Sequence, residues 1–204
     1  MNLQRAFWLK QLHTWHWVSA ALSLTGMLLF AITGITLNHA GQITAATTRA
    51  ERQASLPPEL HRQLRQWSID TEDPLPDALT RWTQKTFGIN VAGRPTETGP
   101  DEIYIDLPMP GGDSALLIER ETGTAFYQTT RRGAIAYLND LHKGRNTGRV
   151  WSWFIDILAS CCIIFTLTGL ALLVLHGRKR PATWPVTSFS LLLPLLVVLL
   201  FMHS

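Results

Sequence analysis

The sequence predicts a membrane-bound α-helical protein with three transmembrane helices and one small α+β domain outside the cytoplasm. Only 16% of its 204 residues are charged, whereas a soluble domain averages about 25%. The charge is also unevenly placed, because all 15 acidic residues lie between Glu51 and Asp156. Apolar runs long enough to cross a bilayer lie on both sides of this polar middle.

The first predicted span covers residues 17–37, after a short N-terminal segment at residues 1–16. The run carries no charge, and about 21 helical residues rise roughly 31 Å, enough to cross the hydrocarbon core. It is longer than the apolar part of a cleaved signal peptide, and Trp15 and Trp17 begin it like an interfacial belt. We therefore expect a retained signal anchor.

The second predicted span covers residues 150–175, and the third covers residues 186–202 after a loop at residues 176–185. Asp156 is the only charged residue within the second span. The third span is close to the lower length limit for a crossing and contains Pro194, so a re-entrant or interfacial segment is its alternative.

The basic residues predict the orientation of these spans. Arg5 and Lys10 precede the first span, and the cluster at residues 178–180 follows the second. Short basic segments stay in the cytoplasm, so residues 38–149 should face outward. In a Gram-negative bacterium the protein would cross the inner membrane with its N-terminus in the cytoplasm and this domain in the periplasm.

The outer segment reads as a small sheet packed on one or two helices. Residues 40–73 carry only weak signals for a helix or linker. Apolar spacing and turn residues predict two helices, at 74–87 and 133–142, and three strands, at 102–107, 114–119 and 124–128. We find no internal repeat, phosphate-binding loop or nucleophile elbow, and the net charge of +3 gives no basis for nucleic-acid binding.

Five of the seven histidines bracket the first two spans. His13 and His16 lie at the inner end of the first span and His39 at its outer end, while His142 and His176 bracket the second. Neutral imidazole is a common axial ligand of haem iron. The depths predict two pairs, His16 with His176 inside and His39 with His142 outside.

One haem could not use both His16 and His39, because about 23 helical residues separate them by roughly 34 Å. The pattern therefore implies two haem sites or none, since a histidine at a membrane interface can simply keep its polar tip wet. His13 is the alternative to His16 at the inner site. Asp156 would orient a ligand histidine or lie near a haem propionate, with interfacial snorkelling as its alternative.

Two segments at the membrane resemble the PepSY-associated transmembrane family. The run WHWVSAALSLTGMLLFAITGITLNHA resembles the family's first helix, with His16, Thr33-Gly34 and Asn38-His39 at the characteristic positions. The run DLHKGRNTGRVWSWFID resembles the approach to the next helix, with His142 as its histidine. The spacing from the histidine to Thr-Gly favours His16 over His13.

A third segment, IERETGTAFYQ, resembles the strand–turn–strand element of a PepSY domain, although Arg120 stands where an aspartate is usual. The resemblance implies a PepSY-like outer domain and, by analogy with some members, a protein with two haem b groups in the inner membrane. Such a protein would pass electrons from a quinol or a partner protein to a ferric siderophore, as a ferric-chelate reductase or an electron-transfer subunit. The alternative is a cofactor-free membrane anchor whose domain binds a periplasmic protein.

Overall fold

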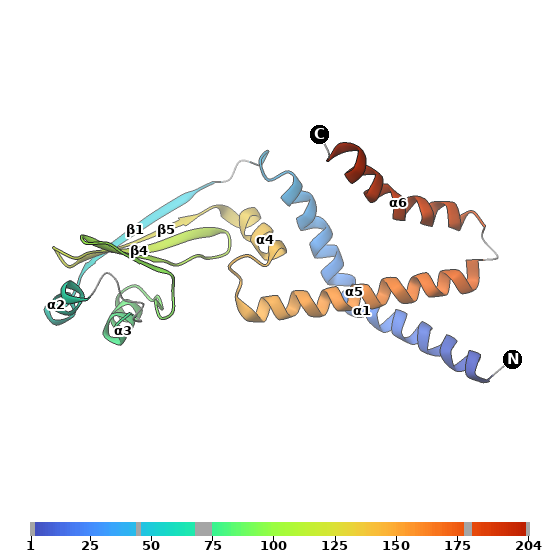
Figure 1. Cartoon of the computed structure of the whole chain (residues 1–204), viewed down its shortest axis with the longest axis horizontal. Helices are drawn as coiled ribbons and strands as arrows, with labels where there is room; N and C mark the ends of the chain where they lie inside the picture. Colours follow the sequence, from blue (N-terminus) through green and yellow to red (C-terminus); the bar gives the residue numbers. More distant parts are fainter. Residues whose placement is uncertain (1–2, 44–45, 68–74, 178–180, 203–204) are drawn as a thin grey trace. The chain divides into compact units, whose positions relative to one another are not determined.

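The computed structural model describes residues 3–43, 46–67, 75–177 and 181–202. The chain forms two compact units (Figure 1), one of residues 1–29 with 154–204 and one of residues 30–153. The first unit is helical, and the second holds a β-sheet with its covering helices.

Within the described residues, three helices are long and apolar enough to cross a membrane, which makes the chain a multi-pass membrane protein. They are α1 (Leu3–Asn38), α5 (Gly148–His176) and α6 (Thr183–Phe201). α1 begins well before the apolar run because residues 3–16 contain no Gly or Pro and consist largely of good helix formers. α6 runs on through Pro194 and buries none of its residues.

Small residues line the face of α1 that packs on α5 in the helical unit. A Cβ on Gly26 would lie 2.5 Å from Leu158 Cδ1, so this glycine permits a close approach of the two helices. Ser19 and Ser23 are buried on the same face, and their hydroxyls donate to the carbonyls of Trp15 and Ser19, respectively. The polar atoms on this face are thus satisfied within α1 itself.

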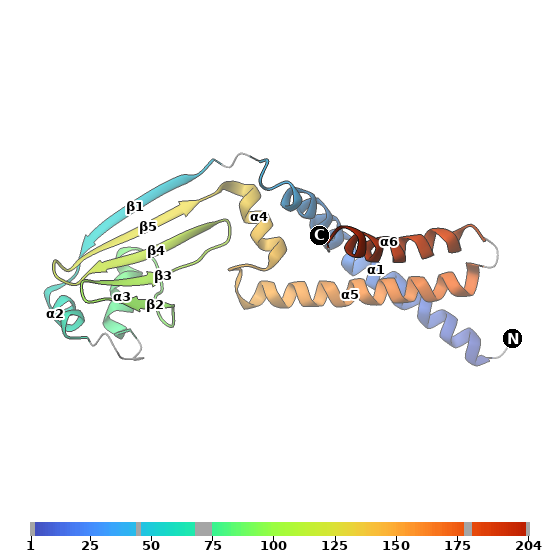
Figure 2. The ribbon, with the colours of Figure 1, turned by 45° about the horizontal axis from the view of Figure 1, so that its top comes forward.

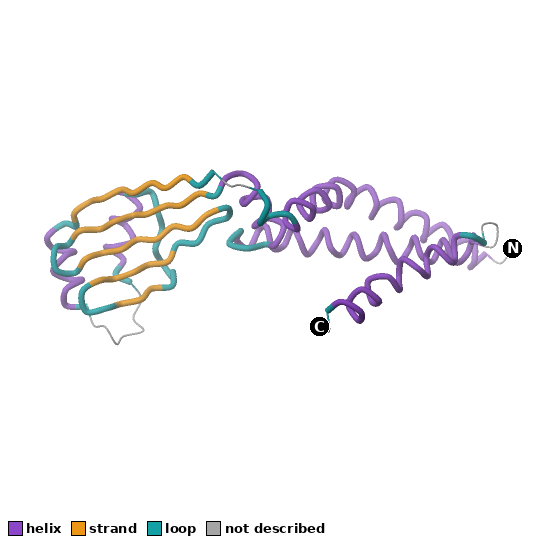
Figure 3. The backbone as a smooth tube through the Cα atoms, turned by 90° about the horizontal axis from the view of Figure 1, so that it is seen from above, coloured by secondary structure: helices purple, strands orange, loops and turns teal. Residues whose placement is uncertain are grey.

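The sheet of the second unit has five antiparallel strands in the order β1-β5-β4-β3-β2 (Figures 2 and 3). The strands are β1 (Thr48–Ser55), β2 (Thr96–Thr98), β3 (Glu102–Asp106), β4 (Gly112–Glu119) and β5 (Thr124–Arg131). Helices α2 (Pro58–Gln66) and α3 (Asp77–Thr86) lie on one side of the sheet (Figure 1).

The core lies between the sheet and these two helices. Every second residue of β3 and β4 points into it, including Ile103, Ile105, Leu116 and Ile118, all with no exposed surface. The helices add buried leucines: Leu60, Leu64 and Leu79. This alternation confirms the strands predicted at 102–107 and 114–119, while α3 and β5 confirm the helix at 74–87 and the strand at 124–128.

β1 is a strand that the sequence analysis did not predict. It lies in the segment expected to be a helix or linker, and every residue of β1 except Ala54 is exposed. A strand with both faces exposed shows no apolar alternation, so only its pairing with β5 identifies it. The short strand β2 was missed as well.

Two arginines hold the C-terminal ends of α2 and α3. The Arg120 side chain is only 7% exposed, and it donates to the carbonyl oxygens of Leu64, Arg65 and Trp67 at 3.0, 3.1 and 2.6 Å. Arg52 of β1 donates to the carbonyls of Thr86 and Phe87 at the end of α3. Cationic donors satisfy the last carbonyls of a helix and complement its dipole, so both helices are tied to the sheet.

Candidate functional site

His142 lies in the last turn of α4 (Gly133–Lys143), which confirms the helix predicted at 133–142. Gly144 ends this helix with a φ of 66°, a left-handed conformation that glycine adopts without strain. Trp151 of α5 then donates from Nε1 to the Leu141 carbonyl at 2.8 Å. The turn at Gly144 and the hydrogen bond from Trp151 together fix the connection between α4 and α5, next to His142.

The His142 imidazole packs on the C-terminal part of α1. Its Nδ1 is 2.7 Å from Thr33 Oγ1, and the Phe30 ring lies 4.9 Å away between centroids. Gly34 leaves room beside the ring, since a Cβ there would be 3.6 Å from His142 Cε1. Thr33 also donates its hydroxyl to the Phe30 carbonyl at 3.2 Å, so its oxygen accepts the hydrogen of His142 Nδ1.

His16 has the same kind of surroundings in the helical unit. Its Nδ1 is 3.1 Å from both the Phe165 carbonyl oxygen and Thr168 Oγ1, and its ring stacks on Phe165 at 4.6 Å. A carbonyl oxygen only accepts hydrogen bonds, so His16 Nδ1 carries the hydrogen. Gly169 is close to the ring, because a Cβ there would be 3.0 Å from His16 Cε1.

The other three membrane histidines are exposed and bond to their own helices. Nδ1 of His13, His39 and His176 lies 2.8, 3.0 and 3.0 Å from the carbonyl oxygen four residues earlier, that of Leu9, Ile35 and Leu172, respectively. Each of these Nδ1 atoms is therefore a donor. In all five membrane histidines Nδ1 has an acceptor among the described residues, and the lone pair of the neutral ring is on Nε2.

His61 has the opposite arrangement. It lies in α2 of the sheet domain, and its Nε2 donates to the Arg120 carbonyl at 2.9 Å. A Cβ on Gly123 would be 2.8 Å from His61 Cγ, so the ring fills the space beside that turn. His61 is thus a packing residue of the sheet domain.

The structure brings His13 and His176 together. Their ring centroids are 5.9 Å apart and their planes are nearly perpendicular, at 80°. Two imidazoles on opposite sides of one metal ion, each at a metal–nitrogen distance of about 2.0 Å, have centroids roughly 6 Å apart. The ring beside His176 is therefore that of His13, our alternative for the inner site, while His16 lies against Phe165.

The antiparallel course of α1 and α5 explains this pairing. His16 is opposite Gly169. Because the helices are antiparallel, residues after Gly169 in α5 lie beside residues before His16 in α1. His176 is two turns beyond Gly169 and His13 is one turn before His16, so the side chains bridge the remaining turn to bring the two ring centroids within 5.9 Å. The distance from a predicted span end does not determine this ring contact, because α1 continues as helix through residues 3–16. The pairing of His16 with His176 at one haem stays a prediction.

The remaining predicted residues stay predictions as cofactor ligands. His39 bonds the Ile35 carbonyl of its own helix, whereas His142 bonds Thr33 and packs on the Phe30 ring. Asp156 is exposed on α5, and its backbone carbonyl accepts a hydrogen bond from Ser160. His203 and the basic cluster at 178–180 lie outside the described residues.

The sequence analysis missed Phe165, Thr168 and Gly169, which surround His16. The signal was a short repeat, Phe-x-x-Thr-Gly, which occurs in FAITG at residues 30–34 and in FTLTG at residues 165–169. Thr-Gly alone is common in this chain, so only the phenylalanine three residues before it distinguishes these two segments.

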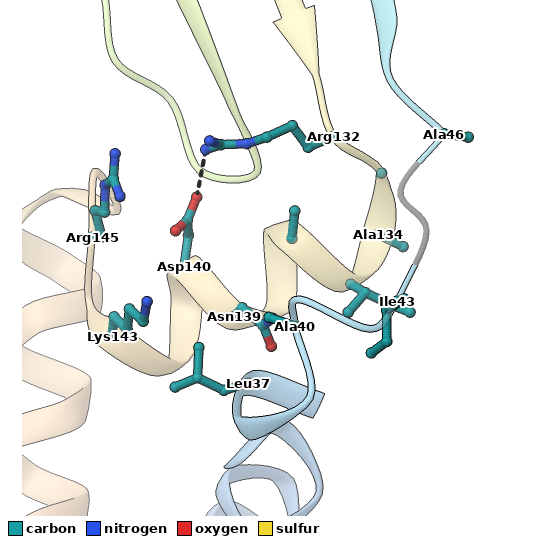
Figure 4. A pocket seen from close by; sticks show the side chains of 13 residues that line it. Leu37, Ala40, Ile43, Ala46, Arg132, Ala134, Asn139, Asp140, Lys143 and Arg145 are labelled. Carbon is teal, nitrogen blue, oxygen red and sulfur yellow. Dashed lines mark ion pairs between the residues drawn. The ribbon is translucent and has the colours of Figure 1, made fainter. Parts of the chain in front are cut away.

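A cavity of about 520 Å³ lies beside α4 in the sheet unit (Figure 4). Leu37, Ala40 and Ile43 line it from the end of α1 and the residues that follow. Its polar lining comes from the other side: Arg132, Asn139, Asp140, Lys143 and Arg145. Asp140 is buried, pairs with Arg132 at 3.6 Å and accepts a hydrogen bond from the Gly111 amide, so its charge is already compensated.

A second cavity, of about 450 Å³, lies in the helical unit. Aromatic and aliphatic side chains dominate its lining, with the Gln11 carboxamide and the Thr168 hydroxyl as the polar groups: Phe7, Trp8, Gln11, Leu12, Trp15, Ile164 and Thr168. Thr168 also bonds His16, so the cavity is next to this histidine.

Comparison with known proteins identifies one family. The profile of a family described as "Putative PepSY_TM-like" matches residues 7–203, nearly the whole chain. Neither a curated protein nor a solved structure matches the chain.

Proposed function

The chain belongs to the PepSY_TM-like family, and we propose that it is a haem b protein that carries electrons across the bacterial inner membrane. The observation that supports this most is the state of the membrane histidines. All five hold Nδ1 against an acceptor, which leaves Nε2 with its lone pair. Ligating histidines characteristically donate their second ring nitrogen to such an acceptor, which sets the tautomer and the ring orientation.

The donor chemistry of these residues fits haem iron, for which neutral imidazole is a common axial ligand. Haem iron that alternates between the ferric and ferrous states would carry one electron at a time. The ring centroids of His13 and His176 are 5.9 Å apart, a spacing compatible with one shared metal ion, and His16 and His142 are half-buried. His39 would complete the outer site with His142, as the sequence suggested.

The orientation rests on charge. Arg5 and Lys10 lie in the N-terminal part of α1, and a short basic segment at the start of a membrane helix stays in the cytoplasm. This puts His13, His16 and His176 at the cytoplasmic face, and His39, His142 and the sheet domain on the periplasmic side.

A quinol is the donor that suits the inner cavity. Its aromatic walls match an apolar ring, and the Gln11 carboxamide can bond a quinol oxygen. Oxidation of one quinol to the quinone releases two protons to water and supplies two electrons, which reduce two ferric chelates to the ferrous state. Thr168, shared between the cavity and His16, would keep the donor close to a ligand.

An anionic ferric chelate, such as a siderophore complex, is the acceptor that suits the outer cavity. Lys143 and Arg145 add positive charge beyond the compensated pair of Arg132 and Asp140, which favours a negatively charged ligand. Lys143 directly follows His142 in α4, so an acceptor bound here would be near that histidine.

The test is the absorption spectrum of the full-length protein, purified in detergent after expression with added haem precursor. We expect a Soret band and split visible bands on reduction, with low-spin signals that require two axial ligands per iron. The reduced protein should then be reoxidised by a ferric siderophore. A colourless protein under these conditions would overturn the proposal.

A second candidate function rests on β1. This exposed strand forms one edge of the sheet, and an unpaired edge can accept a strand from another protein. The protein would then be an anchor for a periplasmic partner. Replacement of Arg49 by Pro, which removes a backbone donor from the edge of β1 that faces away from β5, should abolish binding of such a partner and leave any haem spectrum unchanged.

A further inference from the structure

We propose that Thr33 and Thr168 are equivalent positioning residues, each of which sets the tautomer and donor strength of one membrane histidine. They belong to two copies of one element, Phe-x-x-Thr-Gly, at residues 30–34 of α1 and 165–169 of α5. Thr33 holds His142, and Thr168 holds His16. This inference rests on the proposed function for its redox consequence, but its structural part can be tested without haem.

The two copies match atom by atom. In each, threonine Oγ1 is bonded to histidine Nδ1, at 2.7 Å for Thr33 and 3.1 Å for Thr168. In each, the phenylalanine three residues earlier packs on the same imidazole, with centroids 4.9 and 4.6 Å apart. In each, the glycine that follows lies beside histidine Cε1, where it leaves room for the ring.

The direction of the hydrogen bonds follows from the threonine hydroxyls. Thr33 donates to the Phe30 carbonyl at 3.2 Å, and Thr168 donates to the Ile164 carbonyl at 2.6 Å. A hydroxyl that gives its single hydrogen to a carbonyl can only accept from an imidazole. Each histidine is thus protonated at Nδ1, and its Nε2 carries the lone pair.

A hydrogen bond from Nδ1 makes the imidazole a stronger donor through Nε2. A stronger donor stabilises ferric iron more than ferrous iron, so Thr33 should lower the reduction potential of the haem that His142 binds. Thr168 would do the same if His16, rather than His13, is the inner ligand. The two copies differ in one respect. His16 has a second acceptor, the Phe165 carbonyl at 3.1 Å, whereas among the described residues His142 Nδ1 bonds Thr33.

This difference predicts an asymmetry between the two threonines. Thr33→Val keeps the shape of the side chain and removes the acceptor, so it should release the His142 tautomer and raise one reduction potential. Thr168→Val should have a smaller effect, because the Phe165 carbonyl still accepts from His16. The serine variants keep the hydroxyl and should behave like the wild type at both positions.

The first experiment uses apo protein. Nitrogen NMR of histidine-labelled full-length protein in detergent distinguishes Nδ1–H from Nε2–H rings. We expect His142 to be an Nδ1–H ring in the wild type and in Thr33→Ser, and a mixture in Thr33→Val. The matched control is Thr25→Val, since Thr25-Gly26 lies in the same helix without a phenylalanine three residues before it.

The second experiment is a redox titration of the haem-loaded variants, together with haem-to-protein ratios. We expect a higher potential in Thr33→Val, a smaller shift in Thr168→Val, and no shift in Thr33→Ser, Thr168→Ser or Thr25→Val. An unchanged His142 tautomer in Thr33→Val would overturn the positioning role, whatever the haem content. If the protein binds no haem but the His142 tautomer still changes in Thr33→Val, the proposed function would be overturned and the role of the threonine kept. If Thr33→Val does not fold, Thr33→Ala replaces it in both experiments.

Discussion

The imidazoles of His13 in α1 and His176 in α5 lie edge to face, with ring centroids 5.9 Å apart. Each ring donates Nδ1 to the carbonyl one turn earlier in its own helix, which leaves both Nε2 atoms available. If these two residues bind one iron, they should fail as a unit. His13→Ala and His176→Ala should each convert one low-spin haem to a high-spin form or lose it, and the double variant should be no worse than either single variant.

Low-temperature spin-state spectra and the haem-to-protein ratio measure this. The matched control is His61→Ala, which removes an imidazole from the sheet domain and should leave both haems unaltered. Full low-spin haem in both single variants would show that these residues are not the ligands. Loss of one haem in His16→Ala but not in His13→Ala would restore the pairing of His16 with His176 that the sequence suggested.

The two glycines of the repeat should differ in their tolerance of a methyl group. A Cβ on Gly169 would be 3.0 Å from the His16 ring, closer than an ordinary contact, whereas a Cβ on Gly34 would be 3.6 Å from the His142 ring. Gly169→Ala should therefore displace His16 and shift its ring-nitrogen NMR signals. Gly34→Ala should leave the His142 site as it is, and equal effects of the two substitutions would contradict this geometry.

Arg120 should contribute strongly to the stability of the sheet domain. Its buried guanidinium bonds three carbonyls at the end of α2 and the Gly99 carbonyl. Arg120→Met removes these bonds and should lower the free energy of unfolding by roughly 3 kcal/mol. Thermal unfolding of the full-length protein, followed by the β-sheet signal in circular dichroism, tests this. The exposed Arg62 supplies a matched control, since Arg62→Met should cost well under 1 kcal/mol.

The outer cavity should select its acceptor by charge. Lys143→Glu and Arg145→Glu reverse two charges in its lining and should slow the reduction of an anionic ferric chelate several-fold. A neutral chelate should be reduced at the wild-type rate, and the difference should shrink at high salt because salt screens exposed charges. Stopped-flow reoxidation of the reduced protein gives the rates. Equal slowing for both chelates would mean that the substitutions act on the haem rather than on docking.

The topology should place the sheet domain and the loop between α5 and α6 on opposite sides of the membrane. Gln63 lies in α2 of the sheet domain, and Thr183 begins α6. Alkaline phosphatase fused at Gln63 should be active, and the same enzyme fused at Thr183 should be inactive. Activity at both positions would disprove the assigned crossings.

The sequence by itself determined the membrane class and the elements with strong local periodicity. Long uncharged runs have few alternatives to a membrane helix, and the alternation in β3 and β4 follows from one buried face. It also singled out the five histidines that flank the first two apolar runs. β1 was not predicted, because an exposed edge strand buries almost no side chains and its residues therefore show no alternation of apolar and polar residues.

Only the tertiary structure decided which side chains surround each histidine. Helix ends predicted from hydropathy gave approximate depths, but the contact between His13 and His176 depends on the register in which α1 and α5 pack. Gly26 and Leu158 set that register by close approach, which no single helix specifies. The same packing brings Thr168 to His16, while the turn at Gly144 brings His142 to Thr33. Contacts between residues more than a hundred positions apart depend on how helices pack against each other, and local sequence patterns carry little information about that.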